Sequence, residues 1–73
     1  MSRMHVLGRH GDSETHWDPS DPDSIRDAER LFEDYRTARC LAFSVEPGGD
    51  AVNIRAFDPT AEEIIVTRPL VGG

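Results

Sequence analysis

Apolar and polar residues alternate near the start of the chain, and this alternation predicts two short strands. In residues 3–9, Met4 and Val6 share one face of an extended segment. Residues 10–13 have turn chemistry, because glycine accepts positive φ and Asp and Ser side chains bond nearby amides. Residues 14–17 are then expected to return as a second strand, which completes an N-terminal hairpin.

An amphipathic helix is expected after the polar segment 18–24. Asp21 suits the N-cap, Pro22 suits the first helical position, and Asp23 favours the positive end of the helix dipole. Apolar residues then recur with helical spacing on one face: Ile25, Ala28, Leu31, Phe32 and Tyr35. This stripe predicts a helix with one buried side.

A second hairpin is expected in the middle of the chain. Residues 41–45 and 52–56 each alternate with a period of two, and the turn residues 47–50 lie between them. Residues 58–60 then interrupt the pattern. Thr60 and Glu63 are spaced to cap a single helical turn there.

The last apolar run predicts a central strand. Ile64, Ile65 and Val66 put apolar side chains on both faces, as in a strand with neighbours on each side. Pro69 ends regular structure, so residues 69–73 are expected to form a tail. Residues 1–68 then make one domain.

The order of these elements predicts the fold class. Two strands precede the helix and three strands follow it. This order favours an α+β domain in which the helix packs across one face of a mixed sheet of four to five strands. With that connectivity we expect a β-grasp arrangement.

Size and charge narrow the possible functions. A chain of 73 residues has a thin core, because it buries only about 60% of its unfolded surface. Fourteen acidic residues against eight arginines, with no lysine, give a formal net charge of −6. This balance argues against nucleic acid and anionic membrane as partners, since both are bound through basic residues. Basic protein surfaces are the favoured partners.

The cysteine and histidine content points to a reducing compartment and away from a metal site. Cys40 is alone, so no disulfide can form within the chain. No apolar run is long enough for a signal peptide or a membrane span, and a cytoplasmic location is expected. His5, His10 and His16 do not have the spacing of a zinc site. No cofactor is expected.

Independent enzymatic activity is not expected. Cys40 would need a neighbouring base to act as a nucleophile, and no such arrangement is legible in the sequence. A calcium loop starting at Asp18 fails because its sixth residue is Asp23 rather than glycine. Cys40 is instead expected to be packed in or near the core.

The end of the sequence carries the main candidate chemistry. Gly72 and Gly73 have no side chains, so a terminal carboxylate there can enter a narrow active-site channel. From Asp58 through Ile64 to Gly73, the chain resembles ubiquitin-like sulfur carriers of the molybdopterin-synthase and thiamine-biosynthesis type and bacterial ubiquitin-like modifiers.

The resemblance implies that Gly73 is activated by an E1-like adenylating enzyme that uses ATP. The activated carboxylate then passes to a thiocarboxylate or to an amine on a target, with an E2-like protein or a sulfurtransferase as a further partner. Because the chain has no lysine, linkage of one copy to the side chain of another is excluded.

An alternative is a small acidic interaction protein of phage or plasmid type, such as a virion component or a host-enzyme inhibitor. It would bind a basic protein surface through Trp17, Asp18, Asp21 and Asp23. Trp17 has two readings: it either anchors this interface or covers one end of the core.

Overall fold

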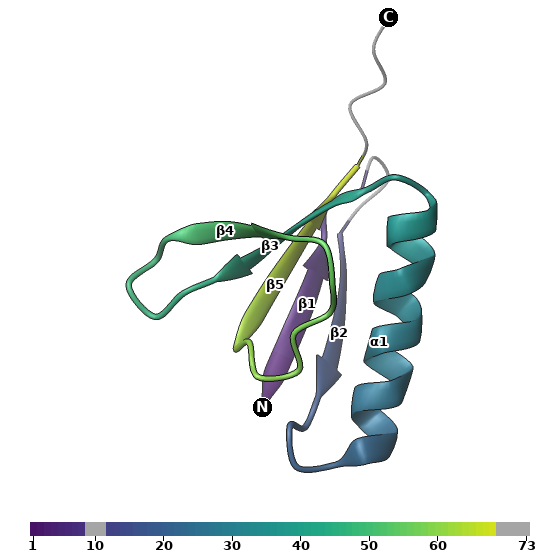
Figure 1. Ribbon diagram of the computed structural model, residues 1–73, viewed down its shortest axis with the longest axis vertical. Helices are drawn as coiled ribbons and strands as arrows, with labels where there is room; N and C mark the ends of the chain where they lie inside the picture. The colour runs from purple at the N-terminus through teal and green to yellow at the C-terminus, as the bar shows by residue number, and fades with distance from the viewer. Residues whose placement is uncertain (9–11, 69–73) are drawn as a thin grey trace, which may run out of the picture.

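The computed structural model describes residues 1–8 and 12–68, in which one helix packs against one face of a mixed five-stranded sheet (Figure 1). The elements are β1 (Ser2–Val6), β2 (Ser13–Trp17), α1 (Pro22–Thr37), β3 (Leu41–Val45), β4 (Ala51–Ile54) and β5 (Glu63–Thr67). The predicted order and the α+β class are confirmed. The first strand is shorter than predicted and ends at Val6, and β4 ends at Ile54 rather than at residue 56.

The strands lie in the order β2-β1-β5-β3-β4. β1 pairs with β5 in parallel, whereas the β1–β2, β3–β5 and β3–β4 pairs are antiparallel. This is the β-grasp arrangement expected from the element order. Within the described residues, β5 is the strand that joins the N-terminal hairpin to the β3–β4 hairpin, which explains why both of its faces are apolar.

The start of α1 follows the predicted capping chemistry. Asp21 is the N-cap, its side chain accepts a hydrogen bond from the Asp23 amide at 3.1 Å, and Pro22 is the first helical residue. Ala28 and Phe32 of the predicted stripe are buried.

A Schellman motif ends α1. The Cys40 amide donates to the Tyr35 carbonyl at 2.9 Å, and the Arg39 amide donates to the Arg36 carbonyl at 2.9 Å. Arg39 has a φ of 67°, in the left-handed region where a side chain other than glycine is strained. Cys40, the last residue of the motif, is buried, as its sequence position predicted.

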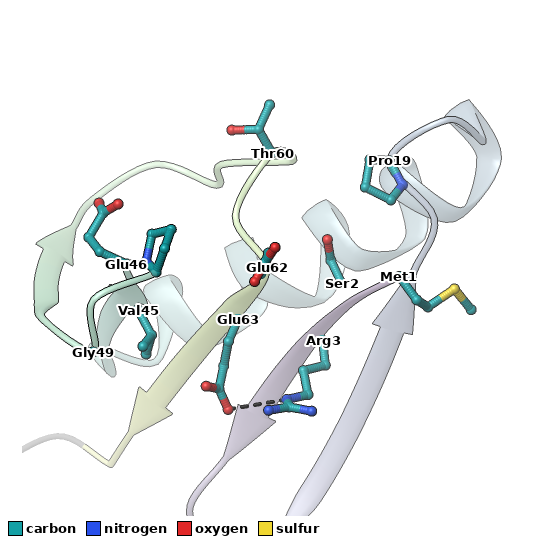
Figure 2. A pocket seen from close by; sticks show the side chains of 11 residues that line it. Met1, Ser2, Arg3, Pro19, Val45, Glu46, Gly49, Thr60, Glu62 and Glu63 are labelled. Carbon is teal, nitrogen blue, oxygen red and sulfur yellow. Dashed lines mark hydrogen bonds and ion pairs between the residues drawn. The ribbon is translucent and has the colours of Figure 1, made fainter.

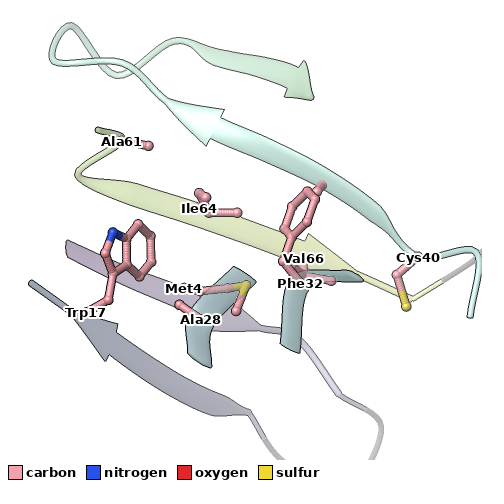
Figure 3. Close-up of a cluster of buried hydrophobic side chains, with 9 residues drawn as sticks. Met4, Trp17, Ala28, Phe32, Cys40, Ala61, Ile64 and Val66 are labelled. Carbon is pink, nitrogen blue, oxygen red and sulfur yellow. The ribbon is translucent and has the colours of Figure 1, made fainter. Parts of the chain in front are cut away.

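The core lies between α1 and the sheet (Figure 3). Its largest fully buried side chains are Trp17, Phe32, Met4, Ile64 and Val66. The ring of Phe57 lies 5.0 Å from that of Trp17 and 5.7 Å from that of Phe32. The Trp17 indole Nε1 donates to the Pro59 carbonyl at 3.0 Å, so the one polar atom of this ring is also satisfied.

The single helical turn predicted near Thr60 is wrong. Asp58 Oδ1 accepts from the Thr60 amide at 2.9 Å and from the Thr60 hydroxyl at 2.7 Å. The Thr60 hydroxyl therefore donates to Asp58 and is not the cap of a helix, and Glu63 is already the first residue of β5. Asp18 and Ser20 form the same kind of turn before α1, with distances of 2.9 and 2.7 Å.

No helix in residues 1–8 and 12–68 has the length and apolar character needed to cross a membrane. The predicted tail, residues 69–73, lies outside the described residues.

Candidate interaction face

β3 has its small residues on the helix side of the sheet and its large residues on the other side. Ala42 and Ser44 are buried, with 2% and 6% of their surface exposed, whereas Leu41 is 38% exposed and Phe43 is half-buried. The helix side is already occupied by bulky rings, including that of Phe32. The larger apolar residues of β3 consequently lie on the face that α1 does not cover.

We call this uncovered side the outer face. Its apolar centre consists of Leu7, Leu41, Phe43, Val45 and Ile65. Phe43 lies opposite Ile65 in the register, and the amide of Leu7 continues the β1–β5 ladder with a 2.9 Å bond to the Val66 carbonyl. α1 lies on the opposite side of the sheet (Figure 1), so no helix of the described chain covers these side chains.

Charged side chains border this apolar centre on the β1–β2 side. Arg3 lies 3.2 Å from Glu63 and 3.9 Å from Glu14. His5 lies 3.4 Å from Asp12. These pairs are solvent-exposed and contribute little to stability. The border has one arginine, Arg3, and three carboxylates, those of Asp12, Glu14 and Glu63, so it is acidic and lies beside the apolar centre.

The exposed apolar residues distinguish this face from an ordinary surface. Single exposed apolar side chains are common, but a contiguous apolar patch on a small domain marks an interaction site. We therefore take the outer face as the candidate functional site.

The residues predicted to contact a partner have structural roles in the folded chain. Trp17 is fully buried, so it covers the core and does not anchor an interface; of its two readings, the surface one is wrong. Its side chain fits between the sheet and Phe57, where its apolar area is removed from water.

The acidic residues around the start of α1 mostly stabilise the local backbone. Asp18 accepts hydrogen bonds from the amide and then the hydroxyl of Ser20, and these bonds lower the pKa of the Asp18 carboxyl. Asp21 caps the helix. Asp23 is 88% exposed and lies 3.9 Å from Arg26, so it remains accessible to a partner.

Gly72 and Gly73, the predicted carrier residues, lie outside the described residues. The outer face was not predicted, although the sequence held its signal. A single helix covers one face of a sheet, yet residues 64–66 place large apolar side chains on both faces, and residues 41–45 add Leu41, Phe43 and Val45 on one face. One of the two apolar sets had to remain uncovered.

Comparisons with known proteins identify no relative of this chain. No protein-family model, curated protein or solved structure matches the chain. The functional argument therefore rests on the fold, the outer face and the sequence of the last residues.

Proposed function

We propose that this protein is a ubiquitin-like carrier or modifier whose outer face binds an E1-like adenylating enzyme and whose Gly73 carboxylate is the activated group. One observation supports this proposal above all. β5 contributes Ile65 to the centre of the outer face and then runs directly into residues 68–73. A partner that binds the outer face therefore contacts the strand that precedes Gly72 and Gly73 in the sequence.

The lengths involved suit such a partner. Six residue steps separate Thr67 from Gly73. In an extended conformation they span about 20 Å, at roughly 3.3–3.6 Å per residue. The carboxylate can therefore reach a nucleotide site well separated from the docking surface, and the absence of side chains at Gly72 and Gly73 suits a narrow channel.

The chemistry follows from the resemblance described above. The Gly73 carboxylate attacks the α-phosphate of ATP, a new P–O bond forms, and pyrophosphate leaves. An amine that attacks this acyl adenylate forms an amide and releases AMP. A persulfide on a sulfurtransferase instead attacks the acyl adenylate, releases AMP and forms an acyl disulfide. A second thiol cleaves this acyl disulfide to the thiocarboxylate and is itself oxidised to a disulfide with the sulfurtransferase sulfur. In either case the protein is a carrier and the partner enzyme performs the catalysis.

The test uses N-terminally tagged protein incubated with host lysate and ATP. Mass spectrometry of the natural protein first establishes whether its chain ends at Gly73. The tagged protein is then compared with a form lacking Gly72 and Gly73, with Phe43→Thr on the outer face, and with Val52→Thr as a matched control. Val52 is also an exposed apolar strand residue, but its register places it on the helix side of the sheet.

We expect an ATP-dependent adduct at Gly73, or capture of an adenylating enzyme, with the intact chain and with Val52→Thr. The form lacking Gly72 and Gly73 and the Phe43→Thr variant should both lose this adduct and this capture. Capture of the same protein with and without the diglycine, and no adduct, would contradict the carrier proposal.

A non-covalent acidic binding protein is the second proposal, and the net charge of −6 favours it. It predicts that the partner is basic, that the tail is dispensable, and that binding weakens strongly as salt is raised from low to physiological concentration. The same capture experiment, repeated across a salt series, distinguishes the two proposals.

A further inference from the structure

Two adjoining hollows lie at the end of the sheet where β1 and β5 begin and β3 ends. The larger has a volume of about 700 Å³ and the smaller about 250 Å³. They share the lining residues Val45, Glu46, Pro47, Thr60 and Glu62. This composite site adjoins the outer face at Val45, whereas Leu7, Leu41, Phe43 and Ile65 line neither hollow.

Two buried serines line these hollows. Ser2 is 2% exposed and lines the larger one, and Ser44 is 6% exposed and lines the smaller one. They are the buried polar residues of residues 1–8 and 12–68, and neither hydroxyl has a hydrogen-bond partner in that part of the chain. No fully enclosed side-chain oxygen there lacks a partner, so both hydroxyls open toward the hollows.

Carboxylates surround the same space. The larger hollow is lined by Glu46, Glu62 and Glu63, against the guanidinium of Arg3. Arg3 lies 3.2 Å from Glu63 and is already engaged (Figure 2). Glu46 and Glu62 have no ion pair with the described residues, so two carboxylates remain available.

The sheet register puts the available groups on one side. Arg3 pairs with Glu63, and Val45 pairs with Glu63 from the other strand. The next row of neighbours toward this end of the sheet consists of Ser2, Glu62 and Glu46. Because side chains alternate along a strand, this row projects to the opposite side of the sheet from Arg3 and Glu63. Figure 2 shows Ser2 and Glu46 projecting toward the side where Thr60 and Pro19 lie, whereas Arg3 and Glu63 project the other way.

We infer that this site binds the guanidinium of an arginine side chain presented by a basic partner peptide. A guanidinium has five donors in a planar fork and no acceptor. The site offers the complementary set: two carboxylates and two hydroxyl oxygens. The aliphatic stem of arginine would pack against Pro47, as such stems do on apolar surfaces.

The test is an NMR titration of the isotope-labelled protein with the peptide acetyl-Ala-Arg-Ala-amide. The matched ligand replaces arginine by citrulline, which keeps the shape and removes the charge. We expect the arginine peptide to shift the amide signals of residues 2, 44 and 62, and the citrulline peptide to leave them unchanged. Equal shifts with both peptides, or shifts that avoid these residues, would overturn the inference.

Variants separate a built site from general attraction to an acidic protein. Glu62→Gln should weaken arginine-peptide binding about tenfold, as expected when a charge-assisted hydrogen bond is lost. Glu33→Gln makes the same change of charge on the exposed surface of α1 and should leave binding unchanged. Ser44→Ala should also weaken binding. Similar losses for Glu62→Gln and Glu33→Gln would refute a specific site.

Discussion

Ile64 and Ile65 are neighbours in the central strand, but they face opposite sides of the sheet. Ile64 is fully buried under α1, whereas Ile65 is half-buried on the outer face. Replacing each of them by threonine makes the same chemical change at adjacent positions and keeps a β-branched residue in the strand. Any difference in stability therefore reports the environment of the two faces.

The expected difference is large. At Ile64, threonine loses about 1.5 kcal/mol of apolar burial, at about 0.8 kcal/mol per methylene-sized group. It also places a hydroxyl in the core, which costs about 1–3 kcal/mol if it finds no partner. Together these give a loss of about 3 kcal/mol. At Ile65 the hydroxyl can reach water and part of the side chain is already exposed, so we expect less than about 1 kcal/mol.

Urea and thermal denaturation measure both variants, with the fluorescence of the buried Trp17 and far-UV circular dichroism as independent probes. For a domain of this size, 1 kcal/mol moves Tm by about 4–8 °C, so Ile64→Thr should lower Tm by about 12–24 °C. Ile65→Thr should lower it by less than about 8 °C. Equal losses that do not depend on protein concentration would refute our assignment of the two faces. An Ile65→Thr loss that grows with concentration would show that a second copy covers the outer face.

Four further substitutions test local features. Trp17→Phe keeps an aromatic ring but removes the indole hydrogen bond, and we expect a loss of about 1 kcal/mol in urea denaturation; an unchanged midpoint would contradict a role for that bond. Asp21→Ala should cost about 1 kcal/mol because the helix loses its N-cap, and a neutral result would count against the capping geometry. Arg39→Gly should raise Tm, because the left-handed conformation costs a non-glycine residue about 1–2 kcal/mol and glycine avoids this strain. A lower Tm would show that the Arg39 side chain makes a compensating contact. The Ser20 backbone and hydroxyl bonds lower the pKa of Asp18 below its usual 3.8, so their stabilising effect is present above that pH and is lost as the pH falls through the lowered pKa. Asp18→Asn should therefore flatten the acid limb of a stability–pH profile, and an unchanged limb would exclude this coupling.

The helix could be predicted because its signals are local. Asp21 and Pro22 mark its start within two residues, and the apolar stripe repeats over several turns. The strand order followed from the short connections and from the two-faced apolar character of residues 64–66. Each of these features depends on residues close together in the chain.

The outer face and the loop before β5 depend on contacts between distant residues. A period of two in residues 41–45 predicts a strand, but it does not say which set of side chains faces the helix. That choice depends on residues far apart in the chain: the buried rings of Trp17 and Phe32 meet Phe57 on the helix side, where β3 presents its small residues Ala42 and Ser44. The interface reading of Trp17 was wrong for the same reason, because its surroundings come from the other end of the chain.

The position of β5 has a consequence for biosynthesis. The first hairpin and the β3–β4 hairpin are held together through a strand that ends at Thr67. During translation, the sheet therefore stays in two separate halves until β5 has left the ribosome. Loop closure between β1 and β5 spans about 60 residues of chain, so formation of this pair should govern the folding rate. Until then, the unpaired edges of β1 and β3 are open to other nascent chains, and a chaperone that shields them would act at that moment.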